Sequence, residues 1–126
     1  VLWPLFRRET RRIRERAAQV ARLVSQHILH ADLTGPRVVV GDLNASYWHP
    51  DFRWLLDAGL VDAHIAHGKG FSASWPTDQI VPAFVRLDHA LTTDGLVSTD
   101  VADFEIPGSD HRGFVVTVAP TPRAMP

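Results

Sequence analysis

Side chains that can bind metal ions and phosphate recur in four short motifs along this 126-residue chain. In each motif they stand at the end of an apolar run, where a strand would stop and a loop begin. Asp, Asn and His side chains that meet at strand ends can hold a divalent cation and a phosphate and can activate a water molecule. In chain order the motifs are Gly41-Asp42-Leu43-Asn44, Ser74-Trp75-Pro76, Arg86-Leu87-Asp88-His89 and Ser109-Asp110-His111.

The first motif follows a predicted strand, Val38-Val39-Val40, whose continuous β-branched run is typical of a buried strand. If the chain stays extended, alternation places the side chains of Asp42 and Asn44 on the same side. A carboxylate and an amide on one side can contact a phosphate and the water that attacks it. The alternative is an Asp-x-Asn turn that only ends the strand, because both residues favour turns.

The third motif lies in a second predicted strand. Residues 85–91 alternate in polarity, which turns Asp88 to one face and His89 to the other. An aspartate within such a strand is costly to bury unless it is paired, so the natural partner of Asp88 is an imidazole or a metal ion. Residues 113–118 predict the last strand, and the loop before it carries Ser109-Asp110-His111.

The four motifs together, in this order and spaced by roughly 30, 10 and 20 residues, resemble the C-terminal half of the endonuclease/exonuclease/phosphatase superfamily. Pancreatic deoxyribonuclease and the apurinic-site endonucleases typify that group. The resemblance implies an α/β (α+β) fold, half of a four-layer α-β-β-α sandwich, with one mixed, mostly antiparallel sheet and flanking helices. Residues 1–119 would form this half domain, and residues 120–126 a loose tail.

The resemblance also implies roles for individual residues in a metal-dependent phosphoester hydrolase. Asp42 would orient or deprotonate the attacking water, and Asn44 would bind the phosphate. Asp88 and His111 would form the acid–base pair, with Asp110 beside the metal ion. The cofactor implied is Mg²⁺, with Mn²⁺ as an alternative. The pairing of Asp88 with His111 agrees with the separate inference that Asp88 needs an imidazole or cationic partner.

Trp75 and Arg86, from the second and third motifs, are the candidate substrate contacts. An indole beside an active cleft can pack against a base or a sugar, although a core tryptophan is an equally good interpretation. The superfamily includes nucleases, phosphodiesterases and phosphatases, and these motifs do not choose among them.

The principal metal ligand of the resembled superfamily, a glutamate, lies in the first half of its fold together with an asparagine. The chain begins with Val1 and not Met, and residues 5–31 predict a basic helix. We therefore expect the chain to be part of a sandwich of roughly 250 residues and to be inactive by itself. Activity is expected of the full-length form.

Composition is that of an ordinary globular chain, with 45% hydrophobic and 21% charged residues. The absence of cysteine excludes disulfides, zinc-thiolate sites and a cysteine nucleophile. No apolar run is long enough to span a membrane. The Trp3-Pro4 pair before the basic helix is nevertheless similar to bacterial members with membrane segments upstream, so a membrane-tethered parent protein is one expectation. The sequence indicates no cellular location.

Charge is distributed unevenly. Residues 1–23 carry seven arginines against two glutamates, a net +5, whereas residues 24–126 carry a net −6. The basic residues fall on a predicted helix near residues 6–31 with one apolar stripe. Such a helix favours nucleic acid or another polyanion as partner, while a solvated helix face is the simpler interpretation. Two other functions remain open: a non-catalytic polyanion-binding module, and a degenerate structural member of the fold that self-associates.

Two histidine pairs also suggest metal binding, His27 with His30 on the predicted helix and His64 with His67 in a glycine-rich stretch. Neither pair has an evident third ligand. We therefore interpret the first pair as packing residues and the second as exposed loop residues.

Overall fold

The computed structural model describes residues 11–12, 15–16, 19 and 35–122. The described positions within the predicted basic helix are helical, and the rest of that helix, with His27 and His30, lies outside the described residues. From residue 35 onward the elements are β1 (Val38–Asp42), α2 (Pro50–Asp57), β2 (Val61–Asp62), α3 (Ala63–Ala66), β3 (Asp88–Thr92), β4 (Leu96–Phe104) and β5 (Gly113–Pro120).

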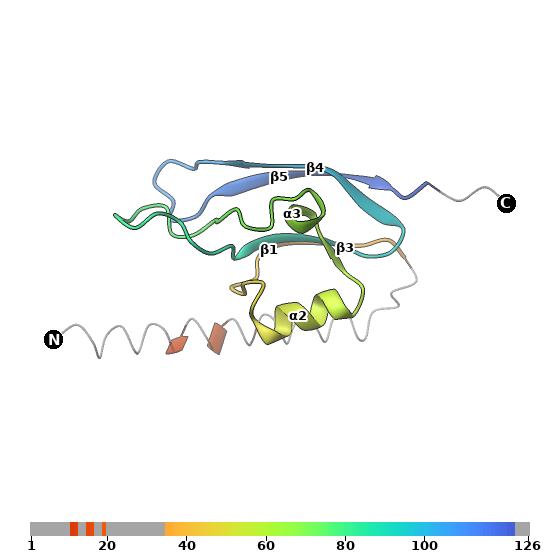
Figure 1. The fold of residues 1–126 in the computed structure, drawn as a ribbon, viewed down its shortest axis with the longest axis horizontal. Coiled ribbons are helices and arrows are strands. Elements are labelled where there is room, and N and C mark those ends of the chain that lie inside the picture. Colours follow the sequence, from red (N-terminus) through yellow and green to blue (C-terminus); the bar gives the residue numbers. More distant parts are fainter. Residues whose placement is uncertain (1–10, 13–14, 17–18, 20–34, 123–126) are drawn as a thin grey trace.

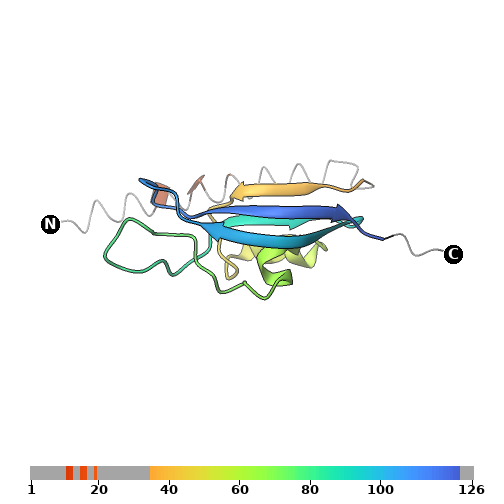
Figure 2. The ribbon, with the colours of Figure 1, turned by 90° about the horizontal axis from the view of Figure 1, so that it is seen from above.

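The strands form two antiparallel sheets, a three-stranded sheet in the order β1-β3-β2 and a hairpin of β4 and β5. Figure 1 shows the hairpin on one side of the three-stranded sheet and α2 on the other. Figure 2, from above, shows the strands of both sheets running nearly parallel to one long axis. The mixed α and antiparallel β class is as predicted. The expected single sheet is divided into two, and no parallel pair occurs among the described strands.

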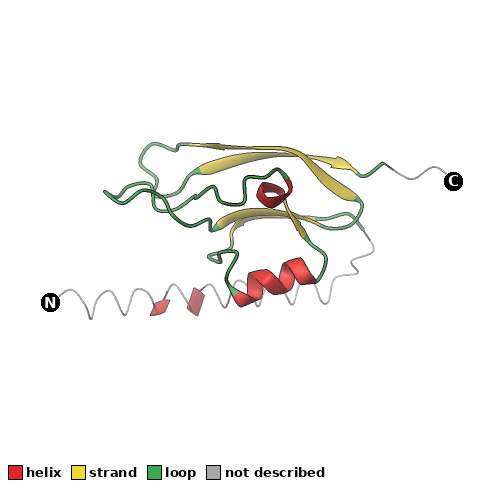
Figure 3. Ribbon diagram, in the orientation of Figure 1, coloured by secondary structure: helices red, strands yellow, loops and turns green. Residues whose placement is uncertain are grey.

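Two apolar clusters hold these layers together, one on each face of β3. Figure 3 shows β3 with α2 on one side and the hairpin on the other. On the α2 side, Phe52 and Leu55 pack against Leu91. On the hairpin side, Ala90 packs against Val101, with α3 filling the space beside them. Since successive strand residues face opposite sides, β3 lies between the two clusters and is the most enclosed strand.

Strand β1 differs from its prediction. The run Val38-Val39-Val40 was expected to be buried, but Val38 is 41% and Val40 61% exposed. The reason is topological, because β1 lies at the edge of its sheet and only the face bearing Val39 packs against the α2 cluster. A β-branched run indicates a strand but does not show that both faces are covered.

Some elements begin or end a few residues away from their predicted bounds. Strand β3 begins at Asp88, while Val85 forms only an isolated bridge with Trp75. Helix α2 is capped by His49, whose side chain accepts a hydrogen bond from the Asp51 amide. Strand β5 includes Pro120, so the predicted tail begins later, and residues 123–126 lie outside the described part. No helix of the described residues has the length and apolarity needed to cross a membrane.

Candidate active site

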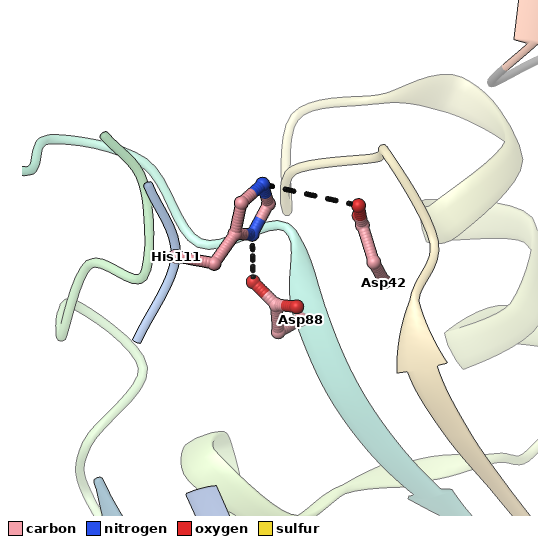
Figure 4. Close-up of side chains that lie close together, drawn as sticks. All are labelled: Asp42, Asp88 and His111. Atoms are coloured by element: carbon pink, nitrogen blue, oxygen red, sulfur yellow. Dashed lines mark hydrogen bonds and ion pairs between the residues drawn. The ribbon is translucent and has the colours of Figure 1, made fainter. Parts of the chain in front are cut away.

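The register of the three-stranded sheet brings the first and third motifs together. Asp42, the last residue of β1, pairs with Asp88, the first residue of β3, so the two carboxylates lie at the same end of adjacent strands. His111 comes from the loop before β5, and Figure 4 shows its imidazole between the two carboxylates. Its Nδ1 lies 2.8 Å from Asp88 Oδ2 and its Nε2 4.0 Å from Asp42 Oδ2.

The His111 loop is held by the second motif. The Arg112 amide donates to the Ser74 carbonyl at 2.8 Å, and the Thr77 amide donates to the Asp110 carbonyl at 2.9 Å. Residues 74–77 and 109–112 are therefore tied together through their backbones. This pairing places the imidazole over the end of β3.

Ser74 completes the hydrogen bonding of Asp88. Its hydroxyl donates to Asp88 Oδ2 at 2.6 Å and accepts from the Leu87 amide at 3.0 Å. Because the same oxygen also accepts from His111 Nδ1, the carboxylate is fixed from two sides. This role of Ser74 was not predicted, since nothing in its type distinguishes it from an ordinary loop serine.

The segment after β1 is a turn and not an extended strand. The Asn44 amide donates to Asp42 Oδ1 at 2.8 Å, and Asn44 has φ +50°, in the left-handed region that asparagine tolerates. Alternation therefore does not govern the direction of the Asn44 side chain, and the prediction of one extended side was wrong. The alternative, an Asp-x-Asn turn, is correct. The turn still keeps Asn44 directly beside Asp42.

The environment shifts two pKa values in ways that suit acid–base chemistry. Burial, reinforced by the charge of Asp88, raises the pKa of Asp42 above 3.8 despite the Asn44 amide that lowers it. Burial lowers the pKa of His111, but the hydrogen bond and charge of Asp88, with Asp42 and Asp110, outweigh burial and raise that pKa above 6.5. His111 therefore keeps its proton to higher pH than a free imidazole.

The gap between His111 and Asp42 has a chemical use. Two polar atoms 4.0 Å apart are too distant for a direct hydrogen bond. One oxygen atom can nevertheless lie about 2.8 Å from both, which is an ordinary hydrogen-bond length. A water molecule or a phosphoryl oxygen there would meet an imidazolium donor and a carboxylate acceptor together.

The raised pKa of His111 predicts a pH-dependent contribution to stability. This contribution is fully present below the unfolded pKa of 6.5 and is lost as pH rises through the higher folded pKa. Asp88→Asn, which removes the partner charge, should therefore lower the free energy of unfolding more at about pH 5.5 than at about pH 9. Urea unfolding at both pH values measures this. Asp100→Asn, an exposed control on β4, should show no such pH-dependent difference. Equal losses for Asp88→Asn at both pH values would contradict the assignment.

The remaining predicted residues lie around this group. Trp75 Nε1 donates to Asp110 Oδ2 at 3.3 Å, and both residues border the His111 loop. Arg86 is placed differently from expectation. It is only 3% exposed, and its guanidinium donates to Asp103 on β4 and to Ser72. Arg86 Nη1 also donates to the Asp88 carbonyl at 3.2 Å. Arg86 therefore supports the backbone beneath the site and does not face its opening.

The structure also shows what His64 and His67 contact. His64 is fully buried and pairs with Asp103 at 3.1 Å, and His67 lies 3.0 Å from the Ser98 carbonyl. The expectation of exposed loop residues was wrong, because α3 is covered by the hairpin. The two imidazoles bind separate partners and make no shared metal site.

Within the described residues, one group of acidic and imidazole side chains could hold a metal ion, namely Asp42, Asp88 and His111. Their ligand atoms lie within 4.8 Å of one another. Mg²⁺ prefers about six oxygen ligands, and this group offers two carboxylates and an imidazole already hydrogen-bonded to Asp88. The carboxylates fit one side of a divalent cation, while the rest of its ligands would come from elsewhere. Asp110 lies outside the group.

A histidine oriented by one carboxylate and facing a second, at the strand ends of an α/β fold, can give and take protons. Residues 4–111 match the Endonuclease/Exonuclease/phosphatase family. The chain therefore belongs to the endonuclease/exonuclease/phosphatase family. The family resemblance of the four motifs is thus confirmed, and with it membership in a group of phosphoester hydrolases.

Two solved structures share the fold. One is a mannosyl-6-phosphatase from Bacteroides thetaiotaomicron, with a TM-score of 0.52 and 17% identity, covering 79% of this chain and 44% of that one. The other is an endonuclease/exonuclease/phosphatase family protein from the same organism, with a TM-score of 0.52 and 18% identity, covering 78% and 43%. This chain spans less than half the length of either. A search of curated proteins found no match.

Proposed function

We propose that this chain is the C-terminal half of a metal-dependent phosphoester hydrolase and supplies the acid–base part of its active site. The observation that carries the proposal is the Asp88–His111 pair at 2.8 Å facing Asp42 at 4.0 Å. The coverage of less than half of the two similar structures supports the half-domain assignment. By itself the chain would be inactive.

The proposed roles follow from the hydrogen bonds. Asp88 accepts from His111 Nδ1, which fixes the ring and directs Nε2 toward Asp42. His111, whose pKa is raised by its carboxylate neighbours, donates a proton or a hydrogen bond to the phosphoryl group. Asp42 accepts the proton of the attacking water. Asn44, beside it in the turn, binds the phosphate.

We further propose Mg²⁺ as the cofactor, with Mn²⁺ as the alternative. Asp42 and Asp88 would contribute carboxylate oxygens, and Asp110 would act in the outer shell of ligands. When bound, the cation neutralises charge on the phosphoryl oxygens. The contribution of this chain is to keep two carboxylates and an imidazole in fixed positions, which lowers the reorganisation needed during reaction.

For the substrate we propose a nucleic acid strand, because residues 1–23 carry a net +5 charge suited to a phosphate backbone. Trp75 would pack against a base or a sugar. A sugar phosphate is the competing substrate, since one of the similar structures is a mannosyl-6-phosphatase. Membrane tethering of the parent protein and self-association of this half remain proposals.

The test is hydrolysis of bis(p-nitrophenyl) phosphate and p-nitrophenyl phosphate by the full-length protein. We expect release of nitrophenol with Mg²⁺ or Mn²⁺, loss of turnover with EDTA, and its return when Mg²⁺ is added in excess. The preferred compound separates diesterase from monoesterase activity. Turnover that is indifferent to EDTA would contradict the metal assignment. Salt-sensitive DNA binding without any turnover would favour the polyanion-binding module instead.

A further inference from the structure

His89 is the next residue after Asp88 and faces the opposite side of β3. Its imidazole is fully buried between the sheet and α2, with its ring centre 4.2 Å from that of Phe52 and 5.3 Å from that of Tyr47. A polar ring in an apolar cluster is costly unless its nitrogens are hydrogen-bonded. Both are.

The two partners of His89 are both acceptors. Its Nδ1 lies 3.0 Å from Asp62 Oδ2, and its Nε2 lies 2.8 Å from the Ala45 carbonyl oxygen. A neutral imidazole has one N–H and could satisfy only one of them. The Ala45 carbonyl oxygen can only accept, so the contact at Nε2 needs the ring N–H on that nitrogen.

Asp62 is fixed in turn by other groups. Its Oδ1 accepts from the Ile65 amide at 2.9 Å, which caps α3, and from the Tyr47 hydroxyl at 3.2 Å. A buried carboxylate costs less when its remaining lone pairs accept hydrogen bonds in this way. Asp62 therefore holds the His89 ring in place, with Nε2 directed at the Ala45 carbonyl.

Ala45 directly follows the turn that carries Asp42 and Asn44. That turn is held on its other side by the Leu43 amide, which donates to the Leu87 carbonyl at 2.9 Å. We propose that His89 is a positioning residue, which clamps the Asp42–Asn44 turn through the Ala45 carbonyl. The role in catalysis rests on the function proposed above, whereas the clamp itself does not. Strand β3 would then fix both parts of the site, His111 through Asp88 and the turn through His89.

Three variants of the full-length protein separate the clamp from general stability. The amide of His89→Gln carries both N–H groups on one nitrogen, so when it donates to the Asp62 carboxylate, the stronger acceptor, it leaves the Ala45 carbonyl without a donor. Asp62→Asn keeps the shape and can turn its amide N–H toward Nδ1, so a neutral His89 still donates from Nε2 to Ala45. His67→Gln is the matched control, because His67 contacts a backbone carbonyl in β4 far from the turn in sequence.

The readout is amide hydrogen exchange, measured well below the unfolding midpoint of each variant. In His89→Gln we expect the buried Leu43 amide to exchange about tenfold faster or more. The Thr93 amide, which donates to the Arg37 carbonyl at the other end of the β1–β3 ladder, should be unchanged. Asp62→Asn and His67→Gln should leave Leu43 near wild type. Unchanged Leu43 exchange in His89→Gln would overturn the clamp, and so would equal acceleration at Thr93.

Should His89→Gln fail to fold, Asp62→Asn still decides the matter. Fast Leu43 exchange in that variant would mean that the carboxylate, and not the Nε2 donor, holds the turn.

Turnover gives the catalytic test. The kcat of folded His89→Gln should fall about 10²-fold, with KM little changed, because a displacement near 1 Å of a reacting group has this effect. A wild-type kcat with fast exchange would overturn the positioning role. A wild-type protein without turnover would contradict the proposed function, but the hydrogen-exchange test of the clamp would still apply.

Discussion

His111→Ala in the full-length protein is expected to lower kcat for phosphoester hydrolysis by about 10²–10⁴-fold. Among the described residues the imidazole lies between the two carboxylates, and its pKa is raised above 6.5, so it keeps its proton to higher pH than a free imidazole. Steady-state kinetics at saturating substrate measure the loss. Added imidazole should restore part of the rate, because the substitution removes the ring beside Asp88 and free imidazole can occupy its place.

The control for this variant is His67→Ala, which removes another half-buried imidazole without touching the site. It should retain kcat within a few-fold of wild type. A His111→Ala protein with wild-type turnover would remove His111 from the chemistry. If His111→Ala lost turnover, was not rescued by imidazole and had a lowered unfolding midpoint, His111 would be a packing residue.

Asp42→Asn is expected to lower kcat by a similar factor, about 10²–10⁴-fold, with a smaller effect on KM. The substitution keeps the oxygen that accepts the Asn44 amide, so the turn should survive while the negative charge is lost. A neutral amide cannot take a proton from water. Measurement of kcat and KM with Mg²⁺ present distinguishes this loss from weaker substrate binding.

Asp57→Asn, at the exposed end of α2, is the matched control and should behave as wild type. If excess Mg²⁺ fully restored Asp42→Asn, the carboxylate would act only as a metal ligand and would have no part in activating the water. Turnover equal to wild type at all Mg²⁺ concentrations would exclude Asp42 from either role.

The part of the site that depends on strand alternation was predictable from sequence. Alternation over residues 85–91 correctly separated the faces of Asp88 and His89, and the cost of burying Asp88 predicted its imidazole partner. These inferences rest on local periodicity and on one electrostatic rule. Neither requires knowledge of distant contacts.

Predictions failed where a strand ended or where a distant residue intervened. Alternation was extended past the end of β1, but Asn44 adopts φ +50° and the rule no longer holds there. Arg86 was expected at the substrate because the sequence does not show that Asp103, on another strand, pairs with it. The exposure of Val40 depends on sheet order, which no local pattern contains.

His89 carried a signal that was not used. It falls at an apolar position of the alternation, beside Leu91, and a polar residue there indicates a buried partner. The identity of that partner, Asp62, follows only from the pairing of β2 with β3. Sequence alone therefore indicates that a buried pair exists, whereas the topology shows which residues make it.

Neighbouring residues of β3 serve opposite faces, so the reaction centre cannot be separated from the strand register. A slip of one residue against β1 would exchange the faces of Asp88 and His89, burying the carboxylate against α2 and turning the imidazole to the hairpin side. The contact of Asp88 with His111 and the contact of His89 with Ala45 would then be lost together. Misregistered molecules should thus be inert rather than partly competent, and assembly of the centre becomes an all-or-none consequence of correct folding.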